Sequence, residues 1–431
     1  MKNNNKNLFA SIFENIRAWQ FAALAIMVVS LLRCLRFPNL WSYTHILFNY
    51  EFGFTKRGGI GALVRFFDAD YVVSYKLFFI FSMLVFIANI ALLAIMVFRL
   101  IKSGNPMFIM AAFVFVSSFG VGYLAHSVGY ADHLALLFVL ISFFIKSFYA
   151  RLIYVFLFMF CIIFVHEGMF VIYYPVVFVS LLMQIGDKNK LLKIILLLSV
   201  SLFISVAVFL ISRSPLERAS AYKMRTVATM RVEKELLEKV MAYEKITGKP
   251  MPMVADNLPS VRRDAFNVLH KKPSATFDKN LSFWKRERHV DRFIDSILVT
   301  LPTIMLLLII SIKAMYRSDI PRKIIFLAAV SVFSPLSLHL IAWDMHRWNV
   351  MGIVTSFVML GFVSQKVTEC YNKQRDFWLL PLILVFVFIN GASDIGLFDR
   401  YKVKPFPFAS HQKYLNDFFY GNESLDYIPQ R

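Results

Sequence analysis

The stretch best suited to chemistry on a phosphorylated ligand is Glu51-Phe-Gly-Phe-Thr-Lys56-Arg57-Gly-Gly-Ile-Gly61. Glycines allow backbone N–H groups to approach a ligand closely, and an arginine can bind a phosphate in bidentate fashion. Glu51 stands a few residues away as a candidate base. The Gly-x-x-x-x-Gly-Lys-Ser/Thr spacing of a nucleotide-binding P-loop is absent. The competing interpretation is an interfacial turn whose cations extend toward water.

Three further turns between apolar runs carry ionisable side chains. Their members are His126, Asp132, His133, His166, Glu167, Asp344, His346 and Arg347. Ionisable residues beside membrane-length segments mark a functional site by default. Imidazoles and carboxylates could move protons or, alternatively, bind a divalent cation, although their spacings match no zinc or di-iron pattern. Each histidine taken singly has a simpler interpretation, as a polar residue that satisfies a helix end.

The composition predicts that these turns are positioned by membrane helices. Hydrophobic residues form 58% of the 431 positions, against about 45–50% in a typical soluble domain. They come in runs of about 18 residues or more, which is the length needed to cross roughly 30 Å of hydrocarbon. A β-barrel would show alternating segments of about ten residues instead. We therefore expect an all-α polytopic membrane bundle, with no cleavable signal peptide ahead of its first span.

The formal net charge of +20 has a membrane explanation. Lys and Arg that flank membrane segments set orientation and contact anionic lipid. No nucleic-acid-binding motif accompanies the charge, so nucleic acid is excluded as a partner. The cysteines, Cys34, Cys161 and Cys370, are scattered and indicate neither a disulfide framework nor a metal knuckle.

About eleven spans are predicted from the apolar runs. They cover residues 18–32, 72–98, 107–125, 134–145, 153–165, 169–183, 191–211, 294–312, 324–341, 350–363 and 378–389. Lys and Arg gather in alternate loops, which places the N-terminus in the cytoplasm and the C-terminus in the periplasm. With this topology all the ionisable turns fall on the outer side.

The spans divide the chain into four parts. Residues 1–212 form an N-terminal membrane bundle that contains the first external loop, 37–70. Residues 213–293 form an external helical loop, 294–393 a C-terminal membrane bundle, and 394–431 an external tail. Within the long loop, apolar residues at helical spacing predict a helix over 232–248. Aromatic and basic residues around Arg288 predict either an interfacial helix or a basic lid that holds an anionic group.

In architecture the chain resembles the GT-C-type glycosyltransferases and bacterial surface-polysaccharide polymerases, of O-antigen or capsule type. The likeness rests on many spans, a carboxylate (Glu51) in a charged first external loop, a long external loop and outward basic groups. Residues 52–61 are also similar to a stretch in uncharacterised bacterial membrane proteins of polysaccharide loci. GT-C enzymes usually have Asp where this chain has Glu51.

The resemblance implies sugar transfer from a polyprenyl-(pyro)phosphate donor at the outer face of the bacterial cytoplasmic membrane. Glu51, or alternatively Asp132 or Glu167, would deprotonate the acceptor, and Asp344 is a further candidate acid. The cationic and imidazole groups would bind the donor and stabilise its leaving phosphate. These groups are Lys56, Arg57, His126, His133, His166, Arg288, His346 and Arg347.

The expected partners are a polyprenyl-linked saccharide, membrane lipids and polysaccharide-assembly proteins. One alternative is a transporter or flippase of an anionic lipid-linked substrate, whose binding groups would lie near the bilayer midplane on broken helices. Another is a non-enzymatic assembly subunit, in which the polar turns only cap helices.

Overall fold

The computed structural model describes residues 16–67, 74–186, 189–212, 215–232, 245–246, 263–267, 269–271, 273–285, 287–340, 344–367 and 379–392. Its regular structure is helical, and no strand occurs in these ranges. The predicted helix over 232–248 falls outside them except for residues 232 and 245–246, and the predicted tail 394–431 falls outside them entirely.

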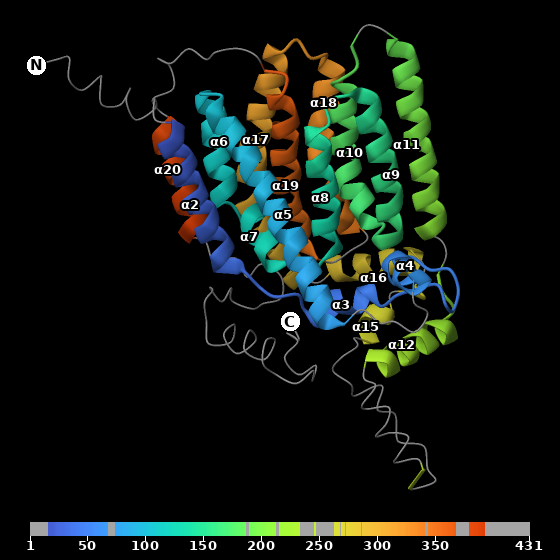
Figure 1. The fold of residues 1–431 in the computed structure, drawn as a ribbon. Coiled ribbons are helices and arrows are strands. Elements are labelled where there is room, and N and C mark those ends of the chain that lie inside the picture. The colour runs from blue at the N-terminus through green and yellow to red at the C-terminus, as the bar shows by residue number, and fades with distance from the viewer. Residues whose placement is uncertain are drawn as a thin grey trace, which may run out of the picture.

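Long helices lie side by side in one bundle (Figure 1). They are α2 (Ile16–Cys34), α5 (Tyr75–Lys102), α6 (Pro106–Ser117), α7 (Phe119–His126), α8 (Ala131–Phe144), α9 (Phe148–Val165), α10 (Gly168–Leu182), α11 (Lys190–Ser212), α17 (Glu287–Arg317), α18 (Arg322–Val332), α19 (Met345–Ser364) and α20 (Leu379–Ala392). The 3-10 helix η1 (Ser334–Leu340) follows α18. Short helices lie at one end of the bundle, namely α3 (Leu40–Ile46), α4 (Gly59–Phe67), α12 (Arg218–Val232), α15 (Arg263–Phe266) and α16 (Pro273–Trp284).

Seven helices among the described residues are long and apolar enough to cross a membrane, or up to eight if α18 and η1, which meet at 46°, form one bent span. The expectation of a helical membrane protein is therefore confirmed. Three further apolar helices, α8, α10 and part of α20, are shorter. Each predicted span overlaps one of these helices or helix pairs, but the number of eleven stays a prediction because several of them fall short of the full length.

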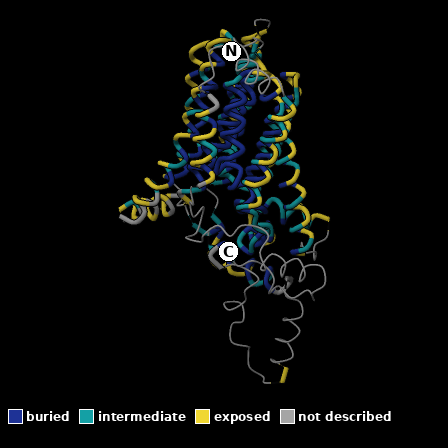
Figure 2. Tube along the Cα trace, turned by 90° about the vertical axis from the view of Figure 1, so that its left-hand side faces the viewer, coloured by how far each residue is buried: buried dark blue, intermediate teal, exposed yellow. Residues whose placement is uncertain are grey.

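The core lies at the centre of the bundle, around the α6–α7 pair and α19. The apolar windows of these two segments are 100% and 94% buried, whereas those of α2 and α11 are only 17% buried. Figure 2 shows this division, with buried residues along the middle and exposed residues on the outer helices. Phe115 of α6 and Phe357 of α19 stack with ring centroids 3.6 Å apart. The exposed outer faces of α5 and α11 are apolar, so lipid is their natural surrounding.

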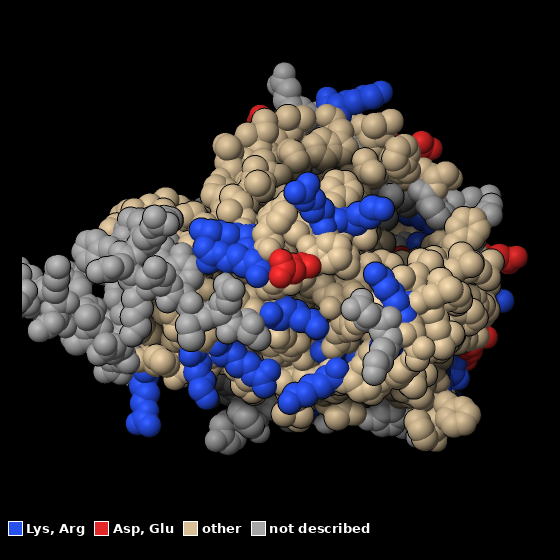
Figure 3. All heavy atoms as spheres, turned by 90° about the horizontal axis from the view of Figure 1, so that it is seen from above, with Lys and Arg blue, Asp and Glu red and all other residues tan. Residues whose placement is uncertain are grey.

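One end of the bundle carries many basic side chains and few acidic ones (Figure 3). The last turns of α5 and α17 supply Arg99, Lys102 and Arg317, and the first turn of α18 supplies Arg322 and Lys323. The short helices cover the opposite end (Figure 1).

A second apolar cluster holds the short helices together. It joins the first loop to the described parts of the long loop, through Tyr43 and Phe48 on one side and Met224 and Phe266 on the other. Ring centroids of Phe48 and Phe266 lie 4.9 Å apart. The first loop is thus packed between the membrane bundle and the long loop, which gives its polar residues defined positions.

Gly61 allows α4 to approach the first loop closely. A Cβ atom on Gly61 would overlap the backbone oxygen of Phe48 and lie 3.0 Å from that of Ile46. Backbone atoms cannot move aside as a flexible side chain can, so α4 or the loop would have to shift.

We expect Gly61→Ala to destabilise the protein by about 1–3 kcal/mol, because overpacking displaces backbone. The melting temperature of the purified protein in detergent measures the effect. Gly186→Ala is the matched control, since a Cβ there meets nothing within 4 Å. Equal melting temperatures for the two variants would contradict the close approach of α4.

Candidate functional site

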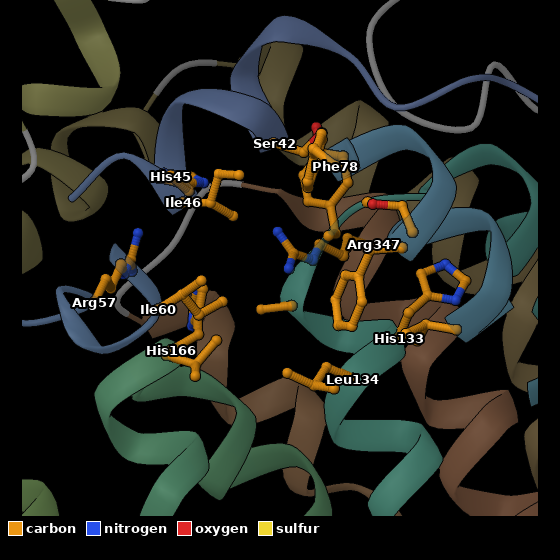
Figure 4. A pocket seen from close by; sticks show the side chains of 17 residues that line it. Ser42, His45, Ile46, Arg57, Ile60, Phe78, His133, Leu134, His166 and Arg347 are labelled. Atoms are coloured by element: carbon orange, nitrogen blue, oxygen red, sulfur yellow. The ribbon is translucent and has the colours of Figure 1, made fainter. Parts of the chain in front are cut away.

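A pocket lies at the end of the bundle that the short helices cover. Its walls come from α3, the start of α4, α5, the start of α8, the α9–α10 turn and the start of α19. Its ionisable lining residues are His45, Arg57, His133, His166 and Arg347. His45, Arg57 and His166 lie on one side, and Arg347 and His133 lie on the other (Figure 4). The fold therefore brings side chains from all four polar turns to one place.

Arg347 is held by a buried carboxylate from a distant part of the chain. Its Nε and Nη2 atoms donate to Oδ2 and Oδ1 of Asp132 at 3.0 and 2.5 Å. The hydroxyl of Tyr123 donates to the same Oδ2. Asp344, the neighbour three residues away, accepts from Nη1 at 3.4 Å and is half exposed. Asp132, and not Asp344, is thus the main partner of Arg347.

Arg57 forms a second bidentate pair, with Glu167. Nε and Nη2 of Arg57 donate to Oε2 and Oε1 at 3.0 and 2.9 Å. Burial raises the pKa of Glu167, but the Arg57 guanidinium outweighs it and holds that pKa below its ordinary value. Glu167 is therefore an ionised carboxylate with both oxygens occupied. The backbone of Arg57 has φ 66°. This left-handed conformation is uncommon for a residue other than glycine, and it occurs where the loop directs the Arg57 side chain to Glu167.

Glu51 lies outside the pocket lining and pairs with Arg65 of α4. This pair is partly exposed, at 25% and 21% of the two side chains. The sequence made Glu51 the first candidate for the base. In the structure its carboxylate forms an ion pair with Arg65 and lies outside the pocket lining. His126 ends α7 and His346 lies in the first turn of α19, and neither lines the pocket.

Arg288 and Lys56 complete the set of predicted residues. The backbone of Arg288 lies in α17, while its side chain is outside the described part of the structure. Lys56 is buried beside Arg57 in the first loop but does not line the pocket.

His45 was not among the predicted site residues. It lies in α3 and faces the pocket, and its Nε2 atom is shielded from solvent and has no hydrogen-bond partner among the described residues. Burial, with the charge of Arg57 added, lowers the pKa of His45 well below its ordinary value. The sequence signal was its place in the same first loop as Lys56 and Arg57.

His166 is oriented by the backbone of the next helix. Its Nδ1 atom accepts a hydrogen bond from the N–H of Gly168 at 3.2 Å, which assigns the ring proton to Nε2. Burial first, and then the charge of Arg57, lower the pKa of His166 to about 3. On the other wall, Nε2 of His133 lies 3.3 Å from the hydroxyl of Ser127. His45 and His166 are thus both neutral near pH 7. His166 carries its ring proton on Nε2, whereas Nε2 of His45 has no hydrogen-bond partner among the described residues.

The described residues contain no group of three or more His, Cys, Asp or Glu side chains arranged to hold a metal ion. The divalent-cation alternative therefore has no candidate ligand set in this part of the chain. Cys34 and Cys161 are free thiols, and Cys370 lies outside the described residues.

Comparison of the chain with protein-family models, with curated proteins and with solved structures finds no match. The function is therefore inferred from the pocket itself.

We expect Asp132→Ala to destabilise the protein by about 3–5 kcal/mol, because it leaves the buried guanidinium of Arg347 unpaired. Thermal unfolding in detergent and the yield of folded protein measure the loss. Asp344→Ala is the matched control, since its longer contact is half exposed and removing it should cost about 0–1 kcal/mol. A similar loss in both variants would show that Arg347 does not depend on Asp132.

We expect stability to fall as the pH falls from about 6.5 toward 3, and His166 to contribute to this slope. The pKa of His166 is about 3 in the fold against 6.5 in the unfolded chain, so the unfolded state binds the proton first and gains from acid. The contribution is roughly 1 kcal/mol at pH 5.5. His166→Asn should flatten the dependence of melting temperature on pH between 7 and 5. An unchanged slope would contradict a buried neutral His166.

Proposed function

We propose that this chain is a membrane glycosyltransferase or polysaccharide polymerase. Its donor would be a sugar linked to polyprenyl (pyro)phosphate, used at the outer face of the bacterial cytoplasmic membrane. The observation that carries the proposal is a pocket lined by two arginines and three histidines at one end of an apolar helical bundle. Such a pocket suits a ligand with a polar phosphate-bearing head and an apolar tail.

The charge of the bundle end opposite the pocket supports this orientation. That end carries Lys and Arg side chains with few acidic ones (Figure 3), in the short turns that follow α5 and α17, and in membrane proteins short loops rich in these residues face the cytoplasm. By that rule the pocket opens to the outer side, where assembly of surface polysaccharide takes place.

The side wall of the pocket supports a lipid-borne ligand. Phe78, Phe81 and Val85 of α5 line it, and Phe81 is 50% exposed on the apolar outer face of the same helix. Its neighbour Leu84 is 61% exposed. A ligand anchored in the bilayer could thus enter sideways past Phe81, with its prenyl chain along α5 and its head between the arginines.

The pairing of the carboxylates leaves His45 as the proton acceptor on the wall with Arg57, and its lowered pKa means that it accepts the proton only as the bond to the acceptor oxygen forms. Both oxygens of Asp132 and of Glu167 already accept guanidinium N–H groups, whereas Nε2 of His45 has no partner among the described residues. In the proposed step the C1–O bond to phosphate breaks and its electron pair leaves with the phosphate. The acceptor hydroxyl oxygen bonds to C1, and its proton passes to Nε2 of His45. Arg57 and Arg347 would stabilise the charge that develops on the phosphate.

Transport of an anionic lipid-linked substrate is the second candidate. The observation that favours it is the 46° bend between α18 and η1, since transporters build binding sites at broken helices. However, η1 contributes no residue to the pocket lining.

We expect His45→Gln to lower turnover about 10²–10⁴-fold, as loss of a general base does, while donor binding persists. The assay uses the full chain in phosphatidylcholine nanodiscs with lipid-linked saccharides extracted from cells that contain the protein, and it measures release of polyprenyl phosphate. Because His270 lies outside the pocket lining, His270→Gln is the matched control and should keep full turnover.

Wild-type protein that releases no polyprenyl phosphate would contradict the transferase. If the wild-type protein instead moved the intact donor across the bilayer of proteoliposomes, the transporter proposal would replace the transferase proposal. Full turnover of His45→Gln would retain the transferase and exclude this base.

A further inference from the structure

Lys56 is a largely buried residue whose ammonium group has no ionic partner among the described residues. It is 8% exposed, and no described residue forms an ion pair or hydrogen bond with its ammonium group. By contrast, Arg57, Arg65 and Arg347 each bind a carboxylate. Burying an unpaired charge is costly, and native structures rarely retain one without a use.

Thr55, the residue before Lys56, also has a polar group without a partner among the described residues. It is fully buried, and its Oγ1 atom has no hydrogen-bond partner among the described residues. A buried hydroxyl without a partner is uncommon. Adjacent residues in one loop therefore present an ammonium group and a hydroxyl that both lack ligands.

The electrostatic surroundings of Lys56 favour an anion. The cations whose charge acts on it are Arg57 and Lys271, and the carboxylate that acts on it is Glu167. Both oxygens of Glu167 already bind Arg57, so the negative charge of Glu167 and the positive charge of Arg57 offset each other. The remaining local charge belongs to Lys56 and to Lys271, which follows α15 in the layer that packs on the first loop.

We propose that Lys56 and Thr55, with Lys271 beside them, form a binding site for a phosphate group. A phosphate oxygen would accept from the ammonium group and offset its unpaired charge, and the Thr55 hydroxyl is the neighbouring donor on the same loop. The site adjoins the pocket through Arg57. The inference deepens the proposed function, because it names the cation that is free to hold the donor phosphate, and it rests on that proposal only for the identity of the donor.

The two pocket arginines would then have a different part. Each already donates two N–H groups to its carboxylate, so fewer N–H groups and less net charge are left for a phosphate. Lys56 has no carboxylate bound to it among the described residues, so its charge adds to that of the arginines. The arginines shape and polarise the pocket, and Lys56 supplies the affinity for the anion.

The test compares Lys56→Met with wild type as full chains in nanodiscs of phosphatidylcholine. One arm titrates inorganic phosphate, and the other incorporates undecaprenyl phosphate into the discs. We expect the anion to raise the melting temperature of the wild type and to bind Lys56→Met at least tenfold more weakly (about 1.4 kcal/mol). Without anion, Lys56→Met should melt higher than the wild type, since an unpaired buried charge is removed. Thr55→Val should weaken binding less.

Lys223→Met is the matched control, because Lys223 is exposed on α12 in the same layer, and it should change neither quantity. Stabilisation by inorganic phosphate supports a site for free phosphate, and stabilisation by undecaprenyl phosphate alone supports a lipid-borne one. No stabilisation by either probe, or a lower melting temperature of Lys56→Met without anion, would overturn the inference.

Binding and turnover separate this inference from the proposed function. Polyprenyl phosphate release with unchanged phosphate binding in Lys56→Met would overturn the site and leave the transferase standing. Binding that depends on Lys56 in a protein without turnover would support the site and reject the transferase.

Discussion

The buried pair of Arg347 and Asp132 is the interaction on which the polar end of this bundle depends. It joins the start of α19 to the start of α8, and the hydroxyl of Tyr123 adds α7 to the same carboxylate. In a poorly polar interior such a pair is stable only when its hydrogen bonds are satisfied. The two parallel N–H···O contacts meet that condition and keep the helix ends in one relative position. The pocket wall that carries Arg347 is a consequence of this arrangement.

The same solution recurs around the pocket. Arg57 binds Glu167 and Arg65 binds Glu51, so the predicted acids Glu51, Asp132 and Glu167 are each held by a guanidinium. Pairing lowers the cost of placing charge near lipid, but it also occupies the groups that the residue types suggested for proton transfer and phosphate binding. Among the described residues, Nε2 of His45 has no hydrogen-bond partner and the ammonium group of Lys56 has no ionic partner. We therefore assign proton transfer and phosphate binding to these two residues and a supporting part to the arginines.

Burial explains where a ligand can reach these groups. The central helices are packed on all sides, whereas the outer faces of α5 and α11 stay apolar and exposed. The long loop closes the pocket end from outside through the second apolar cluster. Beside α5, Phe81 belongs both to the pocket lining and to the exposed outer face of the helix. This geometry is the basis on which we propose a membrane-anchored ligand.

The sequence by itself determined the class of fold, the approximate positions of the apolar helices and the grouping of four polar turns at one end. These follow from the length of apolar runs and from alternate basic loops, which are properties of neighbouring residues. Only the tertiary structure decided which charges meet. Arg347 takes its main partner 215 residues away and makes only a longer contact with the aspartate three residues before it, and Glu51 pairs with Arg65 beside the pocket. Such choices depend on how distant helices pack, and no local pattern encodes them. For the same reason the part of His45 could be recognised only in the fold, and Lys56, which the sequence predicted as a binding residue, is distinguished from Arg57 only by its lack of a carboxylate partner among the described residues.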